Sequence, residues 1–95
     1  MQNPVQHEES PTKGAFYIDR DGERVAEMSY SRTNEHMIII DHTNVDDSLR
    51  GQGVARQLLD ALVAWARGTH TKVLPLCAYA KAQFDKDPSI RDLLA

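Results

Sequence analysis

The chain has 95 residues, of which 41% are hydrophobic and 26% charged, and a formal net charge of -3. One domain with a modest core fits this length, and the acidic balance argues against general nucleic-acid binding and slightly favours a cationic substrate. No apolar run approaches the roughly 20 residues of a membrane span. The single cysteine, Cys77, excludes an internal disulfide and fits a reducing cytoplasm.

The first residues of the chain are polar. Residues 1–13 include Pro4 and Pro11, and we expect a mostly irregular lead-in rather than a secretory signal. Within this lead-in, Val5–Glu8 has the pattern of a short edge strand. Residues 14–95 are expected to form the single domain.

Three segments then have the pattern of strands. Gly14–Asp19 and Arg24–Ser31 alternate apolar and polar residues, and Asp21-Gly22 between them is a strong hairpin signal. A second turn is predicted at Thr33–Glu35. His36–Val45 is the most strand-like segment, and its three consecutive isoleucines predict a central strand that is covered on both faces.

A helix, a short strand and a second helix follow. Val54–Arg67 has apolar residues four apart, which predicts an amphipathic helix that stops at Gly68. Lys72–Cys77 is a short strand in which Pro75 removes one ladder donor, so we expect an edge strand or a local splay. Ala78–Asp85 is predicted to be a second, shorter helix.

The order of these elements predicts an α+β fold with a mixed sheet and two main helices. The first three strands are joined by tight turns and are expected to be antiparallel. The fourth follows a helical crossover, so we expect it to lie parallel to the third through a right-handed connection. The glycine-rich turn Leu49–Arg56 then lies at the C-terminal end of the third strand, where ligands of α/β sheets collect.

This turn has the features of an anion site. From Arg50 to Leu59 there is no Asp or Glu, and a helix start without carboxylates suits an external anion on its free N–H groups. A Walker A loop requires Gly-Lys followed by Ser or Thr, but Val54 follows Gly53. A Rossmann fingerprint requires a small residue where Arg56 stands. An ordinary glycine-containing loop with a charged edge is a further alternative.

The loop Arg50-Gly51-Gln52-Gly53-Val54-Ala55 resembles the pyrophosphate loop of GNAT-superfamily acetyltransferases, Gln/Arg-x-x-Gly-x-Gly/Ala, at every fixed position. Further marks of the small, single-domain branch flank it: Asp41–Val45, Pro75–Tyr79, Phe84 and Pro88. The resemblance extends from about Phe16 to Pro88. It implies a minimal GNAT fold and an acetyl-coenzyme A-dependent N-acetyltransferase, an acyltransferase with acetyl-coenzyme A as co-substrate. The pantetheine arm is then expected between the third and fourth strands.

The resemblance also implies which residues bind the coenzyme. They are Val45, Arg50, Gly51, Gln52, Gly53, Val54, Ala55, Arg56, Tyr79 and Phe84. Gly53 is expected to let the backbone approach the diphosphate, and the N–H groups of residues 52–56 to point at it. Core packing is the alternative role for Phe84, and proton donation to the leaving thiolate is an alternative for Tyr79.

His42 and Cys77 are the candidate catalytic residues. Histidine exchanges a proton near neutral pH and suits a base that deprotonates an amine. His42 is expected on the face shared by Ile38 and Ile40, opposite Cys77 across the acetyl group. A Cys–His pair allows a covalent acetyl-cysteine intermediate. The alternatives are direct transfer, a structural histidine and a buried cysteine that acts as a small hydrophobic residue.

The acceptor is not readable from the sequence beyond an amine: a protein lysine, an N-terminus or a small amine such as a polyamine. A coenzyme A-binding or sensing module with little turnover is the alternative function, and a generic nucleotide-binding domain is a weaker one. We expect no nucleic-acid or membrane partner, and a monomer or weak dimer. No metal is implied, because His7, His36 and His70 show no metal-ligand spacing.

Overall fold

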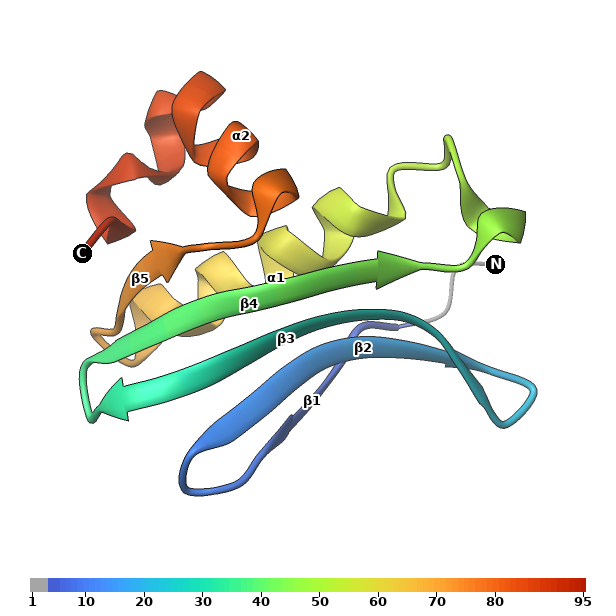
Figure 1. The fold of residues 1–95 in the computed structure, drawn as a ribbon, viewed down its shortest axis with the longest axis horizontal. Coiled ribbons are helices and arrows are strands. Elements are labelled where there is room, and N and C mark those ends of the chain that lie inside the picture. The colour runs from blue at the N-terminus through green and yellow to red at the C-terminus, as the bar shows by residue number, and fades with distance from the viewer. Residues whose placement is uncertain (1–3) are drawn as a thin grey trace.

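The computed structural model describes residues 4–95 as one five-stranded sheet with two helices and two short 3-10 helices (Figure 1). The elements in chain order are β1 (Gln6–Glu9), β2 (Lys13–Arg20), β3 (Glu23–Asn34), β4 (Met37–Val45), η1 (Asp47–Leu49), α1 (Val54–Gly68), β5 (Lys72–Pro75), α2 (Ala78–Lys86) and η2 (Pro88–Leu93). The start of the predicted lead-in, residues 1–3, lies outside the described residues.

The sheet has the strand order β1-β2-β3-β4-β5, so neighbours in sequence are neighbours in space. The first four strands are antiparallel, and β5 pairs with β4 in parallel after the crossover through α1. The predicted mixed α+β fold is therefore confirmed. No helix within residues 4–95 is both long and apolar enough to cross a membrane.

The first hairpin turn has the predicted residues. Asp21 and Gly22 both have positive φ, 52° and 81°, which matches the two-residue turns whose twist suits antiparallel strands. The second turn lies at Glu35–His36, later than predicted, because β3 runs on to Asn34. There the Asn34 side chain accepts a hydrogen bond from the His36 N–H at 2.8 Å.

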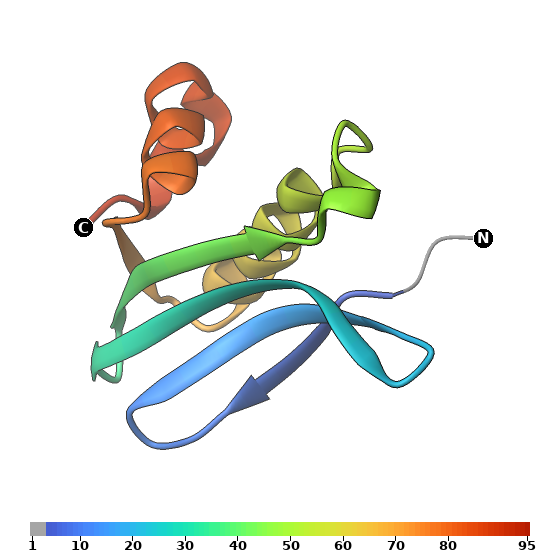
Figure 2. The ribbon, with the colours of Figure 1, turned by 45° about the vertical axis from the view of Figure 1, so that its right-hand side comes forward.

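The core lies on one face of the sheet, against α1. Buried residues of α1, α2 and η2 form a single cluster with the inward-facing residues of the strands. Figures 1 and 2 show α1 behind the sheet and the front face free of helices. We call this front face the open face. The prediction that β4 is covered on both faces is wrong: Ile38 and Ile40 are fully buried, but Ile39 between them is only half-buried.

The helix α1 forms because its apolar residues repeat at helical spacing. Six of its residues are buried in the core: Val54, Leu58, Leu59, Leu62, Val63 and Ala66. Burial of one Leu side chain contributes about 1.5–3 kcal/mol, so this face fixes α1 on the sheet. That docking in turn holds the N-terminus of α1 at the end of β4, beside the glycine-rich loop.

A β-bulge interrupts β4 near its middle. Ile40 lies opposite Tyr30, whereas His42 lies opposite Ser29, so Asp41 is an extra residue without a partner of its own in β3. An extra residue in one strand shifts the alternation of side chains by one position. Even-numbered residues of β4 therefore face the core before Asp41, and odd-numbered residues face it afterwards.

The bulge decides which side chains face the core. Thr43 lies opposite Met28, which is fully buried, so Thr43 points towards α1. His42 lies opposite Ser29, on the open face, and its side chain is exposed. The prediction that His42 shares a face with Ile38 and Ile40 is therefore wrong, because the alternation on which it rests does not continue through Asp41.

The pairing of β4 with β5 ends early. The two strands pair from Met37 and Lys72 to Ile40 and Pro75. The Ile40 carbonyl then accepts from the N–H groups of two residues after Pro75, each at 3.1 Å, and the chain turns into α2. Within the described chain, residues 41–45 thus have a strand partner only on the β3 side. The predicted splay near Pro75 is confirmed, and it leaves an opening between β4 and the start of α2.

Candidate active site

The glycine-rich loop brings the chain from β4 into α1 through left-handed backbone conformations. Gly51 and Gly53 have φ of 79° and 72°, and Gly53 is the N-cap of α1. A Cβ on Gly53 would meet nothing within 4 Å, so the protein itself leaves space there. The positive φ is a sufficient reason for glycine, because other L-residues are strained in this region.

The start of α1 presents unpaired backbone donors. The first backbone hydrogen bond of the helix runs from the Gln57 N–H to the Gly53 carbonyl at 3.1 Å. The N–H groups of Val54, Ala55 and Arg56 precede this bond and have no partner within the helix. Gly53 has no capping side chain, and the first turn contains no acidic residue. This helix start therefore suits an anion, as the sequence predicts.

A pocket of about 200 Å³ lies against this helix start. Its lining comes from the end of β4, the loop, the first turn of α1 and the start of α2. The lining residues are Val45, Leu49, Arg50, Gly51, Gly53, Val54, Ala55, Arg56 and Tyr79. All of them except Leu49 belong to the predicted coenzyme-binding set, so the structure brings most of that set together.

Three residues differ from the prediction in their placement. Leu49 lines the pocket but is absent from the predicted set. It is 3% exposed, and an apolar residue just before the loop is the sequence feature that indicates a buried position there. Phe84 lies in the core at 1% exposure, consistent with the core-packing alternative, and does not line the pocket. Gln52 is exposed, and its Nε2 donates to the Ser48 carbonyl at 3.3 Å.

The two arginines of the loop have different surroundings. The Arg50 side chain is 82% exposed, and its ion pair is with Asp47 at 2.7 Å. Arg56 donates to Asp60, to Asp87 and to Gln83 at 2.9, 2.5 and 2.9 Å. The guanidinium of Arg56 is thus already engaged by three acceptors, whereas that of Arg50 can turn towards an anion. Arg50 is the better candidate for a charged contact.

Tyr79 lies on the far wall of the pocket, in the first turn of α2. Burial raises the pKa of its phenol above the ordinary value of 10, and Arg56 opposes the shift. The phenol therefore keeps its proton at neutral pH. A protonated phenol can donate a hydrogen bond to an acceptor in the opening.

Cys77 ends the segment after β5 and caps α2. Its Sγ accepts the Ala80 N–H at 3.4 Å, as an N-cap side chain does. The same sulfur lies 3.1 Å from Thr43 Oγ1, across the opening between β4 and α2. Cys77 is 9% exposed. The predicted cysteine therefore stands at the inner end of the opening, and the side chain of β4 that contacts it is Thr43.

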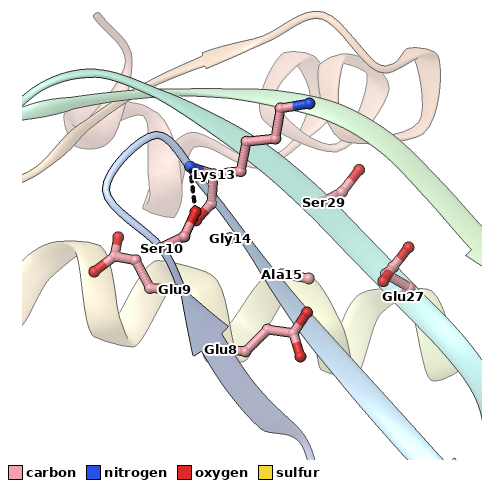
Figure 3. Close-up of a pocket in the computed structure, with 8 residues that line it drawn as sticks. All are labelled: Glu8, Glu9, Ser10, Lys13, Gly14, Ala15, Glu27 and Ser29. Atoms are coloured by element: carbon pink, nitrogen blue, oxygen red, sulfur yellow. Dashed lines mark hydrogen bonds between the residues drawn. The ribbon is translucent and has the colours of Figure 1, made fainter.

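His42 stands on the open-face side of β4, and its cross-strand partner lines a second hollow. This hollow of about 380 Å³ lies over the open face of β1, β2 and β3, and Ser29, the cross-strand partner of His42, belongs to its lining. Figure 3 shows Glu8 and Glu27 on either side of Ala15 within it. The role of His42 as a base stays a prediction.

The backbone of β4 offers further hydrogen bonds to the opening. The Asp46 N–H donates to the Val25 carbonyl at 2.8 Å, which makes these two residues a hydrogen-bonded pair of the antiparallel ladder. Such pairs alternate along a ladder. The N–H and C=O groups of Thr43 and Val45 therefore point away from β3, into the opening. They suit a ligand that carries amides.

Comparison of the sequence with known protein families identifies the family of this chain. The family described as GCN5-related N-acetyl-transferase matches residues 15–93. The chain belongs to this family. The resemblance noted in the sequence is thereby confirmed, and the protein is an acyltransferase of the GNAT class. No curated protein matches the chain. Residues 4–95 contain no group of three or more His, Cys, Asp or Glu that could hold a metal.

Solved structures agree with this assignment. A GCN5-like protein from Staphylococcus aureus, itself classed as an N-acetyltransferase by inference, is 36% identical, with a TM-score of 0.74. The match covers 100% of this chain and 91% of that one, so the relative is also a small domain.

More distant structures share the fold. A ribosomal-protein-alanine N-acetyltransferase from Brucella melitensis is 21% identical, with a TM-score of 0.63, over 90% of this chain and 64% of that one. The aminoglycoside N-acetyltransferase AAC(6')-Iy, solved with CoA, is 16% identical, with a TM-score of 0.57, over 80% and 66% of the two chains.

Proposed function

We propose that this chain transfers the acetyl group of acetyl-coenzyme A to an amine, with the pyrophosphate of the coenzyme at the start of α1. The observation that carries the proposal is the pocket at the uncapped helix start, which is lined from Val45 at the end of β4 to Tyr79 in α2. Free N–H groups and the exposed Arg50 provide donors and positive charge for a diphosphate.

The opening between β4 and α2 offers contacts to the rest of the coenzyme. The backbone groups of Thr43 and Val45 are available to the pantetheine amides, as an added strand would use them. Tyr79 lines the same passage and holds its proton at neutral pH. In this pose the thioester lies towards Cys77, at the inner end of the opening. The protonated phenol is then a donor for the leaving thiolate.

Two routes of transfer are open to these residues. In direct transfer, the amine nitrogen attacks the thioester carbon, the carbon–sulfur bond of the coenzyme breaks, and the departing thiolate takes a proton. In the covalent route, Cys77 Sγ loses its proton and attacks the thioester carbon first, the carbon–sulfur bond of the coenzyme breaks, and coenzyme A leaves as the protonated thiol. The amine then attacks acetyl-Cys77, the bond between Sγ and the acetyl carbon breaks, and the proton lost by the amine restores the thiol. His42 would take the proton of the amine on the open face in either route.

The acceptor is proposed to approach from the open face. No helix covers this face, and the hollow over Ala15 begins at Ser29, beside His42. Such an open approach admits a protein lysine, an N-terminus or a small amine. A free thiol at Cys77 is in keeping with a cytoplasmic enzyme.

Intact-mass measurement after incubation with acetyl-coenzyme A alone tests the covalent route. We expect a gain of one acetyl group in the parent chain and none in Cys77→Ala. Transfer to an amine panel at the parent rate by Cys77→Ala would instead assign direct transfer. Measurable coenzyme binding without acetylation of any amine would sink the enzyme proposal.

A coenzyme A-binding module with little turnover is the second candidate. The observation that favours it is the separation of His42 from Cys77, which lie towards opposite faces of β4. A module of this kind keeps the helix-start pocket and does not require His42. The rate of acetyl transfer to an amine distinguishes the two functions. In an enzyme, His42→Gln abolishes this transfer; in a binding module there is little transfer to lose. The affinity for the coenzyme should be unchanged by His42→Gln in either case.

A further inference from the structure

We propose that the acceptor is the side chain of a lysine within a polypeptide, with its ammonium on the carboxylate of Asp41 and its apolar stem along Ile39 and Leu74. The inference rests on the proposed function, because it names the amine that the acetyl group would reach. It concerns the part of the open face where the pairing of β4 with β5 ends.

The β-bulge brings two consecutive side chains of β4 to the open face. Asp41 is the extra residue, and its Oδ2 accepts a hydrogen bond from Ser31 Oγ at 2.6 Å. Ser31 lies opposite Ile39 on the open face, so the carboxylate lies on that face as well. His42 follows on the same face. The pairing with β5 ends one residue before Asp41, at Ile40, so both side chains stand beside the opening.

Asp41 is a carboxylate of the open face without a cation. Glu8 and Glu27, which line the hollow, both bind Arg24, at 2.9 and 2.5 Å. Asp41 forms no ion pair within residues 4–95, and Ser31 is its one hydrogen-bond donor there. The serine thus orients one carboxylate oxygen, and the second oxygen can accept from an ammonium. Hydrogen bonds between charged partners are the strong ones.

An apolar surface adjoins this carboxylate. Ile39 lies opposite Leu74 of β5 on the open face. Ile39 is half-buried and Leu74 is 37% exposed, so both leave apolar surface in solvent beside Asp41. The methylene stem of a lysine covers such a surface while its ammonium stays in a polar place. An amino sugar lacks this stem, and the amine of an N-terminus adjoins a polar peptide group.

The charge of the open face favours one ammonium rather than several. Arg24 and Arg32 bind the glutamates that line the hollow. Lys13 also lines it and adds a positive charge (Figure 3). A second ammonium, such as a small diamine carries, would meet no unpaired carboxylate among these lining residues. A lysine in a polypeptide brings one ammonium, and no helix covers the face against the chain that carries it.

Acetyl transfer to a peptide with one lysine and blocked termini tests the contact with Asp41. We expect Asp41→Asn to raise KM for this peptide about tenfold, the effect of one hydrogen bond between charged groups. The KM of the same peptide with an aminooxy group as its amine, which is neutral near neutral pH, should stay unchanged. Glu35→Gln removes an equal charge from the turn before β4 and should behave as the parent does.

The length of the side chain tests the apolar contact. Shortening the lysine by one methylene at a time should lower kcat/KM about threefold at each step in the parent. Leu74→Ser should flatten this dependence, because it removes apolar surface that the stem covers. The same dependence in Leu74→Ser and in the parent would overturn the contact with the stem.

The remaining outcomes separate this inference from the proposed function. Equal KM values for Asp41→Asn and the parent, or an equal rise with the aminooxy peptide, would overturn the inference. Faster transfer to a small diamine or to a free N-terminus than to the lysine would overturn it as well. Absence of transfer to any amine would defeat the proposed function instead. Calorimetric titration of the lysine peptide into the coenzyme A-bound protein would then still decide the role of Asp41, through weaker binding in Asp41→Asn or the same binding as in the parent.

Discussion

Arg56, in the first turn of α1, and Asp87, the residue that ends α2, form an ion pair with 2.5 Å between Nη2 and Oδ2. The same guanidinium donates to Gln83, one of the few buried polar side chains among the described residues. Arg56 therefore connects the two helices that contribute walls to the pocket proposed for the coenzyme. In the proposed function, Arg56 therefore serves to hold the walls of that pocket at a fixed separation.

Arg56→Ala is expected to lower the thermal midpoint of unfolding by a few degrees, because it removes this connection. Coenzyme binding should weaken by a similar factor at low and at high salt, since the loss is structural. Circular dichroism melting and calorimetric titration at two salt concentrations check both points. A loss of affinity that salt abolishes would instead assign Arg56 a direct phosphate contact.

Acid should weaken the same connection. Hydrogen bonds from Ser89 and Arg56 lower the pKa of Asp87 to about 2, below the ordinary 3.8. A carboxylate with a lowered pKa in the folded state contributes stability above its ordinary pKa and loses it as the pH falls towards the folded value. Stability is therefore expected to drop between pH 3.8 and about 2. Urea denaturation across this window should show a shallower drop in Asp87→Asn.

Arg50→Ala should weaken coenzyme binding more at low salt than at high salt, because an exposed contact is screened. The ion pair of Arg50 with Asp47 joins two side chains that are 82% and 85% exposed, so its loss should leave the melting temperature unchanged. Asp47→Asn supplies the opposite test: it frees the guanidinium and should tighten binding. Weaker binding in Asp47→Asn would contradict the proposed contact.

Gly53→Ala is expected to reduce coenzyme affinity at least about tenfold, because the N-cap must leave its left-handed conformation and turn the helix N–H groups away. Gly22→Ala is the matched control. Both glycines have positive φ and open space at the Cβ position. They differ in location: Gly53 lines the pocket, whereas Gly22 lies in the first hairpin turn. Both variants should lose about 1–2 kcal/mol of stability. Equal affinities in the two variants would refute the pyrophosphate role of the loop.

The packing of β1 should depend on pH through His7. Its ring stacks on Phe16 with centroids 4.1 Å apart, and its Nε2 lies 2.6 Å from Tyr30 Oη. Burial lowers the pKa of His7 below 6.5, and Arg32 adds to this shift while the neighbouring glutamates oppose it. The folded state thus favours the neutral ring. Its stabilising effect is complete above pH 6.5 and is lost as the pH falls below that value.

Trp65 fluorescence reports this change, because its ring lies 5.0 Å from that of His7. We expect a transition in mild acid that His7→Phe removes. His36→Gln, at the turn between β3 and β4, serves as the control and should leave the transition in place. A transition that persists in His7→Phe would show that another group titrates.

Local patterns predicted the helix start and the glycine-rich loop before it. The spacing of apolar residues in α1 and the glycines before it are short-range features, and the pocket forms from them. The face on which His42 lies was predicted wrongly, because a bulge depends on how β4 pairs with β3 and leaves no mark in the alternation of one strand. The partners of Arg56 were equally out of reach: Asp87 is far along the chain and only the packing of α2 brings it near.

Burial was predicted less well where a residue type suggests more than one role. The run Ile38–Ile40 reads as a fully buried strand, but Ile39 is only half-buried, because no helix covers the open face. His7 reads as a scattered polar residue, and the ring contacts that hold it arise only when β1 pairs with β2. Both cases depend on tertiary contacts that override the local pattern.

The extra residue in β4 has a consequence for comparing and engineering such enzymes. Removal of Asp41 would take out the extra residue and leave His42 opposite Ser29 and Thr43 opposite Met28, so the later side chains of the strand would keep their faces. An alignment without a gap here, to a relative whose strand lacks the extra residue, would therefore equate residues of opposite orientation after Ile40. The faces of the two halves of β4 must therefore be assigned separately: Ile38 and Ile40 face the core before Asp41, and Thr43 does so after it.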